Sequence, residues 1–216
     1  MAAIEQSSAG ELVPSGAPPE PAHDAHSTHT GVANPKLAMW LFLSSDCLFF
    51  GAFIATYLLY RDRAGQTGPT PQDVFNIPFT SVTSFILLMS SLTMVLALAA
   101  MQRKDQRRMR VWLLTTALLG ATFIGGQVYE FTVFYRAGLS LHENLFGSSF
   151  FVLTGFHGAH VTIGILMLLS LFVISAKGRL AEDRTETVEL IGLYWHFVDV
   201  VWIVIFTVVY LIPGVK

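Results

Sequence analysis

The sequence predicts an all-α membrane protein whose five transmembrane helices form a bundle. Of its 216 residues, 53% are hydrophobic and only 13% are charged. A soluble domain of ordinary composition carries about twice that share of charge. The apolar residues gather in five stretches, each long enough to cross a hydrocarbon layer of roughly 30 Å as a helix. These observations exclude a typical soluble domain.

The chain is expected to begin with a disordered tail over residues 1–35. This segment holds five of the nine prolines and almost no large apolar side chains, so it cannot bury enough surface to fold. His23, His26 and His29 recur at every third residue. They could chelate a metal loosely, but a solvated low-complexity tail is the favoured interpretation. The tail lacks the features of a secretory signal, so the first span is the expected insertion signal.

The rest of the chain, residues 36–216, is predicted to be one transmembrane domain. Its spans are expected at about residues 37–60, 79–101, 111–135, 149–176 and 190–212. The first connection, residues 62–78, is rich in glycine and proline and should be an irregular loop. The second is short, which predicts that spans two and three are antiparallel neighbours.

The basic residues predict the orientation. Nine of them fall before the first span or in the second and fourth connections, namely Lys36, Arg103, Lys104, Arg107, Arg108, Arg110, Lys177, Arg179 and Arg184. Only Arg61, Arg63, Arg136 and Lys216 lie on the other side. Because Lys and Arg are retained in cytoplasmic loops, the N-terminus is predicted to be cytoplasmic and the C-terminus external.

Charge and cysteine content exclude several kinds of site. The net charge of −2 and the placement of the basic residues beside spans give no basis for nucleic-acid binding. Cys47 is the one cysteine, so the chain can form neither an intrachain disulfide nor a thiolate metal cage.

Three carboxylates fall inside the spans, where each costs a few kcal/mol unless it is paired or protonated. Asp46 lies about ten residues into the first span, which places it near the middle of the bilayer. It could store or relay protons, or it could join two helices by hydrogen bonds, and position alone favours the second role. Glu130 lies near the outer end of its span, where a structural role is favoured. The third carboxylate is Asp199.

Histidines occur in pairs with other polar residues on two spans. His157 and His160 share a face of the fourth span, and His196 and Asp199 share a face of the fifth. Imidazoles could ligate a haem or a metal, although this spacing is a weak metal signature. The favoured alternative is a hydrogen-bonded network that joins Asp46 to these four residues. No metal site is predicted. Glycines beside these groups, among them Gly120, Gly125 and Gly164, would let helices approach closely.

Four strings carry a resemblance to a known family. They are WLFLSSDCLFFGA over residues 40–52, QVYEF over 127–131, FFVLTGFHGAHVTIG over 150–164 and YWHFVDVVWIVIF over 194–206. The chain resembles subunit III of the haem–copper oxidases, respiratory complexes that reduce oxygen to water and pump protons. The likeness runs from about Asn34 to the C-terminus and matches the five-helix bacterial form, which lacks the first two helices of the mitochondrial form.

The resemblance implies a non-redox subunit in a bacterial plasma membrane. The catalytic subunit I, subunit II and possibly small subunits would be its partners, and the haem and copper would lie in those partners. Bound phospholipid, support of proton uptake and protection against turnover-linked inactivation are further implied. The family's buried carboxyl, usually Glu ahead of paired phenylalanines, falls on Asp46 ahead of Phe49 and Phe50. The other matching positions are Glu130, His157, His160, Trp195, His196, Asp199 and Trp202.

Three functional alternatives remain from the sequence. Within the family, two segments are similar to quinol oxidase sequences, namely Ser45 to Cys47 and the loop Gly68 to Thr70. The segment Thr154 to His157 is similar to cytochrome c oxidase sequences, and this second assignment is favoured. Outside the family, the chain could be a stand-alone haem-binding redox protein or a small proton-coupled transporter. A chromophore in the isolated chain would indicate the former, and substrate flux without partners the latter.

Overall fold

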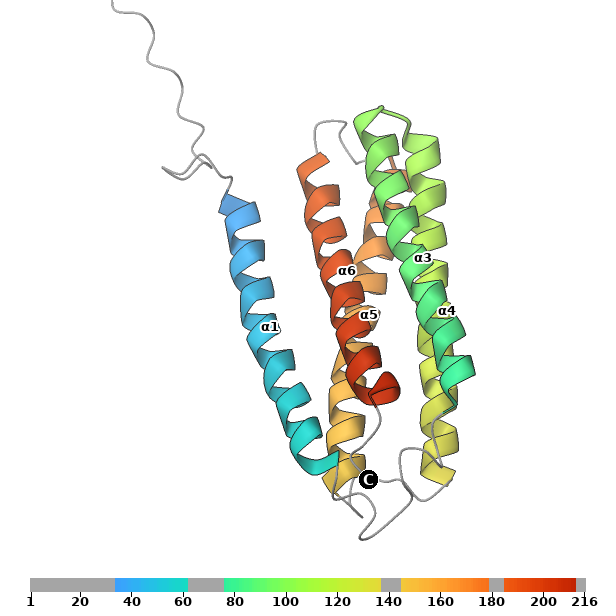
Figure 1. Cartoon of the computed structure of the whole chain (residues 1–216). Coiled ribbons are helices and arrows are strands. Elements are labelled where there is room, and N and C mark those ends of the chain that lie inside the picture. The colour runs from blue at the N-terminus through green and yellow to red at the C-terminus, as the bar shows by residue number, and fades with distance from the viewer. Residues whose placement is uncertain (1–33, 62–75, 137–144, 179–184, 213–216) are drawn as a thin grey trace, which may run out of the picture. The chain divides into compact units, whose positions relative to one another are not determined.

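The computed structural model describes residues 34–61, 76–136, 145–178 and 185–212, which are helical almost throughout and contain no strand. The helices are α1 (Asn34–Arg61), α3 (Ile77–Gln102), α4 (Gln106–Arg136), α5 (Leu145–Ala176) and α6 (Thr185–Phe206), and α6 continues into the π-helical turn η2 (Thr207–Leu211) (Figure 1). Five helices are long and apolar enough to cross a membrane. The predicted all-α fold with five spans is therefore confirmed.

The helices extend beyond the predicted spans, and two predicted boundaries change. Residues 34 and 35, expected in the tail, already belong to α1, while the rest of the tail lies outside the described residues. Pro78, expected in the first connection, lies in the first turn of α3, where its missing N–H breaks no hydrogen bond. The side chain of Asn76 accepts a hydrogen bond of 3.3 Å from the Phe79 N–H and so caps this helix. Residues 62–75 lie outside the described part.

Helices α3, α4, α5 and α6 form a closed four-helix ring. Helix α3 packs against α4 and α6, and α5 packs against the same two helices from the other side. A tight turn joins the antiparallel helices α3 and α4, as the short connection predicted (Figure 1). Lys104 has a φ of 59° in this turn, and the Asp105 N–H donates to the Ala100 carbonyl at 2.9 Å.

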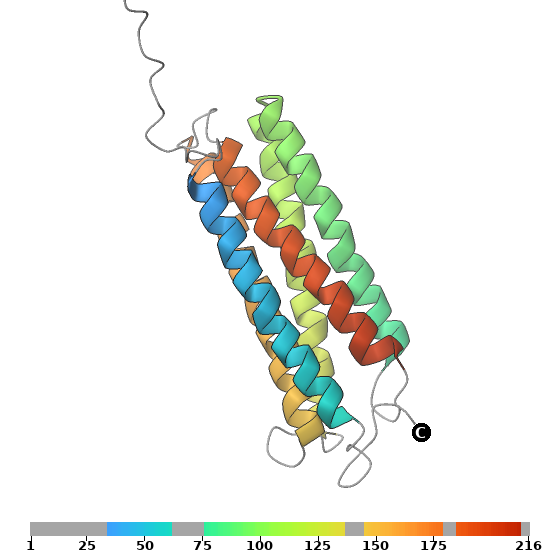
Figure 2. The same ribbon diagram turned by 60° about the vertical axis from the view of Figure 1, so that its left-hand side comes forward.

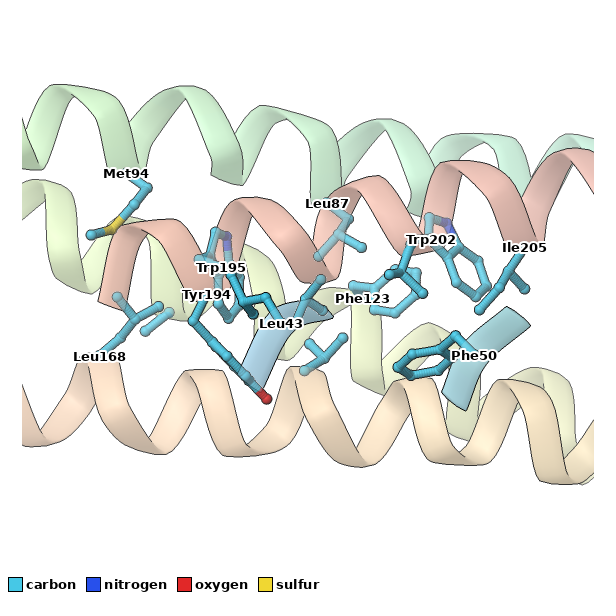
Figure 3. Packing of buried hydrophobic residues seen from close by; sticks show 14 of the residues in the cluster. Leu43, Phe50, Leu87, Met94, Phe123, Leu168, Tyr194, Trp195, Trp202 and Ile205 are labelled. Carbon is cyan, nitrogen blue, oxygen red and sulfur yellow. The ribbon is translucent and has the colours of Figure 1, made fainter. Parts of the chain in front are cut away.

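Two tryptophans of α6 fill the centre of this ring (Figure 3). Trp195 Nε1 donates to Ser90 Oγ at 2.9 Å, and Trp202 Nε1 donates to Ser84 Oγ at 2.8 Å. Both hydroxyls belong to α3, so each indole ties α6 to α3. A buried indole needs such an acceptor, because an unpaired N–H costs about 1–3 kcal/mol.

Glycines on α4 and α5 make room for the Trp195 ring. A Cβ added at Gly120 would lie 2.6 Å from the ring atom Cη2, and one added at Gly164 would lie 2.8 Å from Cε3. The close approach expected of small residues occurs at these positions. At Gly125, by contrast, an added Cβ would meet no atom within 4 Å.

Helix α1 lies along α5 and α6, outside the ring, and touches them through side chains (Figure 2). At one end Lys36 Nζ lies 2.6 Å from Glu189 Oε2 of α6. At the other end the buried Arg61 donates from Nη1 to the Val208 carbonyl of η2 at 3.2 Å. Most of its remaining surface is exposed and apolar, as expected for a helix that faces lipid.

Candidate functional site

Asp46 and His160 form a carboxylate–imidazole pair between α1 and α5. Asp46 Oδ2 lies 3.5 Å from His160 Nε2, and the two side chains are only 13% and 15% exposed. His160 Nδ1 lies 2.8 Å from the Phe156 carbonyl. A carbonyl can only accept, so Nδ1 carries a hydrogen and a neutral ring presents the Nε2 lone pair to Asp46. At this distance Asp46 Oδ2 has no hydrogen-bond partner among the described residues.

His157 shares a helix face with His160 but has different surroundings. Its side chain is completely buried, and neither ring nitrogen has a hydrogen-bond partner among the described residues. The ring stacks on Trp202 with a centroid distance of 4.8 Å and an interplanar angle of 27°. Phe50 and Phe123 contact it edge-on. The imidazole thus packs as an aromatic ring.

His196 bonds to a serine rather than to Asp199. Its Nδ1 lies 2.5 Å from Ser91 Oγ of α3. Asp199 is 3% exposed, and within the described part of the chain neither carboxylate oxygen has a hydrogen-bond partner, although Ser91 adjoins it.

The continuous network expected from the sequence is therefore not present in direct contacts. The described side chains instead form separate groups. Asp46 pairs with His160, His196 bonds to Ser91 with Asp199 beside that serine, and His157 lies outside both groups. The physical reason is that spacing along one helix predicts a shared face but not which hydroxyls a neighbouring helix supplies.

Glu130 lies in a second polar cluster, near the opposite end of α3 from the basic turn. The carboxylate is buried and accepts a hydrogen bond from Thr80 Oγ1 of α3. The contact joins α3 to α4.

The paired phenylalanines of α1 point in different directions. Phe49 is 40% exposed and meets Phe156 of α5 with ring centroids 5.3 Å apart. Phe50 is buried (Figure 3), and its ring centroid lies 5.1 Å from that of His160 and 6.4 Å from that of His157. Phe50 therefore packs α1 against both histidines of α5, and Phe49 packs it against Phe156.

Sequence reasoning missed the hydroxyl groups of α3 that hold the site together. Thr80, Ser84 and Ser91 bond to Glu130, Trp202 and His196 respectively. Their spacing of four and seven residues places them on one helix face, and this pattern was readable in the sequence. Within residues 34–61, 76–136, 145–178 and 185–212, no three or more His, Cys, Asp or Glu side chains are grouped to hold a metal.

Comparisons with known proteins identify the family. The family described as cytochrome c oxidase subunit III matches residues 20–213. A probable quinol oxidase subunit 3 from Staphylococcus saprophyticus is 38% identical over 194 residues, covering 88% of this chain and 96% of that protein. A cytochrome c oxidase subunit 3 from Bacillus sp. (strain PS3) is 40% identical over 178 residues, covering 82% and 86%.

These matches, with five helices able to span a membrane, make the chain a multi-pass protein of the bacterial plasma membrane that associates with other oxidase subunits. Both relatives are bacterial and are matched over most of their length. The chain belongs to the subunit III family of the haem–copper terminal oxidases.

Proposed function

We propose that this chain is subunit III of a cytochrome c oxidase, packing on the catalytic subunit I beside subunit II. Oxygen reduction and proton pumping occur in the complex, and the haem and copper belong to the partner subunits. The chain supports proton uptake, binds phospholipid and prolongs the life of the enzyme during turnover. Its family membership supports the assignment to an oxidase.

The contact between Asp46 and His160 is the observation that carries the proton role. A carboxylate and an imidazole lie 3.5 Å apart near the middle of the bundle and are mostly shielded from solvent. The Phe156 carbonyl orients the imidazole, and carboxylates and imidazoles are side chains that transfer protons in other proteins. The same contact also ties α1 to α5, so structural and proton roles must be separated by experiment.

The test uses Asp46→Asn, which keeps the size and polarity of the side chain but removes its acid. Asp46→Glu restores the acid. Ser45→Ala is the control because, among the described residues, the Ser45 hydroxyl bonds to the Phe42 carbonyl of its own helix and to no other group. Oxygen consumption by the assembled complex is followed to inactivation. We expect Asp46→Asn to begin at a near-normal rate and to inactivate sooner, while Asp46→Glu and Ser45→Ala behave as the native enzyme. Loss of all initial activity in an assembled complex, or an unchanged lifetime, contradicts the proposal.

A quinol oxidase is the second candidate, because a relative named as a probable quinol oxidase subunit 3 matches as well as the cytochrome c oxidase relative. The string Thr154 to His157 favours cytochrome c. The purified complex should oxidise reduced cytochrome c faster than a quinol. The reverse preference would assign the chain to the quinol branch.

The proposed orientation places the N-terminus in the cytoplasm. Lys36 and the α3–α4 turn belong to the same end of the bundle, since successive helices alternate in direction. In a variant without Cys47, a cysteine introduced at Arg107 should react with an impermeant maleimide only in inverted vesicles. A cysteine introduced at Arg136, at the opposite end of α4, should react only in right-side-out cells. The opposite pattern would reverse the orientation.

A further inference from the structure

A pocket opens between the end of α3 and the start of α4, away from the contact of Asp46 with His160. Its volume is about 890 Å³. Arg103, Arg107 and Arg108 line its polar side, with Asp105 between them. The tight turn at Lys104 brings these side chains together, because it reverses the chain within a few residues.

The charges of the pocket are unbalanced. Asp105 Oδ1 accepts a hydrogen bond from the Arg108 N–H at 3.0 Å, and Oδ2 lies 3.2 Å from Arg108 Nε. The single acid is therefore already engaged by one arginine. Arg103 and Arg107 are exposed and have no ion pair within the described part of the chain. The N-terminal end of α4, at the same place, adds its own partial positive charge.

The opposite wall of the pocket is apolar. It includes Leu96 of α3 together with Val111 and Trp112 of α4. Val111 comes four residues after Arg107, which places it about 6 Å deeper in the membrane at 1.5 Å per residue. Val111 is also 57% exposed, so the wall is open at the depth of lipid chains. The pocket thus matches a ligand with an anionic head and an apolar tail.

We propose that this pocket binds one anionic phospholipid, with its phosphate between Arg103 and Arg107 and an acyl chain along Leu96 and Val111. A basic pocket between spans at the polar surface has the chemistry to hold a lipid phosphate. The apolar wall favours a lipid over inorganic phosphate or an acidic protein segment. This inference assigns the lipid binding proposed above to these four side chains. It rests on the proposed function only in that the chain lies in a membrane.

The test compares the whole oxidase complex carrying the double substitution Arg103→Gln and Arg107→Gln with a matched control. The control carries Arg136→Gln and Lys177→Gln, which remove the same charge from exposed positions outside the pocket. Each complex is placed in nanodiscs of phosphatidylcholine with increasing phosphatidylglycerol, and the retained lipid is counted by native mass spectrometry. At roughly a fivefold loss per charge, the pocket variant should bind phosphatidylglycerol about 30-fold more weakly and retain one molecule fewer. The control should match the native complex.

Several results would overturn the assignment. Equal retention of phosphatidylglycerol by both variants would show that the pocket does not bind this lipid. Displacement of the lipid by an equal concentration of inorganic phosphate would show that the ligand is a free anion. A photoreactive residue at Val111 should crosslink to lipid, and crosslinking to another subunit instead would make the pocket a protein interface. If the double variant does not assemble, Arg107→Gln alone should show about a fivefold loss. Lipid retention is counted independently of turnover lifetime, so failure here is distinct from failure of the Asp46 proposal.

Discussion

Gly120→Ala tests whether the Trp195 ring is held in place by its neighbours. The added Cβ would lie 2.6 Å from Cη2 and 3.0 Å from Cζ2 of the indole. The ring is 1% exposed, Gly164 lies close to it on α5, and its Nε1 is bonded to Ser90. It therefore cannot retreat without straining the packing or breaking that hydrogen bond.

The expected cost follows from three contributions. Overpacking a core costs about 1–3 kcal/mol, and a weakened indole hydrogen bond adds about 1 kcal/mol. Replacing a glycine inside a helix by alanine stabilises the helix by about 0.5–1 kcal/mol. Gly120→Ala should thus lower the free energy of unfolding by about 1–3 kcal/mol. Gly125→Ala, on the same helix but in open space, is the control and should be neutral or up to about 1 kcal/mol more stable.

The assay is reversible unfolding of the purified chain by sodium dodecyl sulfate in mixed micelles, followed by tryptophan fluorescence. The two alanine variants differ in nothing but the position of one methyl group on α4. Equal free energies of unfolding for both variants would refute the reasoning that Trp195 is confined.

Three further substitutions test the polar contacts by the same assay. Thr80→Val removes the hydroxyl that bonds to Glu130, and Ser84→Ala removes the acceptor of the Trp202 N–H, so each should cost about 1–3 kcal/mol by leaving a buried group unpaired. His157→Leu breaks no hydrogen bond within the described residues and forfeits mainly a ring contact, so it should change stability by no more than about 1.5 kcal/mol.

Two substitutions away from these contacts are the controls. Within the described part of the chain, the hydroxyls of Ser81 and Thr132 bond to carbonyls of their own helices alone, so Ser81→Ala and Thr132→Val should change stability little. Unaltered stability of the Thr80 or Ser84 variant would show that those bonds contribute nothing net. A loss of several kcal/mol on His157→Leu would reveal a polar partner for the imidazole.

The spans were predictable because length and apolarity alone define a membrane helix. The positive charge of the α3–α4 turn was predictable from its basic residues, and the antiparallel pairing of those helices was predictable from their short connection. The boundaries of the helices were less predictable from the sequence. Pro78 reads as loop in isolation, yet a helix tolerates it in the first turn.

Side-chain partners were not predictable from local pattern. Ser84 and Trp202 are 118 residues apart, and many hydroxyls on α3 were equally plausible acceptors. Gly120 and Gly125 are the same residue type on the same helix, yet Gly120 faces Trp195 and Gly125 faces open space. Shared helix faces suggested that His196 would pair with Asp199, whereas the bundle places Ser91 beside the imidazole.

The position of α1 has a consequence for biosynthesis. This helix leaves the ribosome before the other described helices, but its partners are on α5 and α6. The bond from Arg61 to Val208 joins residues 147 positions apart. Helices α3 and α4 can pair as soon as both are made, since only a tight turn separates them. The first span must therefore be in the bilayer before its partners α5 and α6 have been synthesised. Because α1 meets α5, α6 and η2 through side chains outside the ring, we expect it to be the last of the described helices to dock.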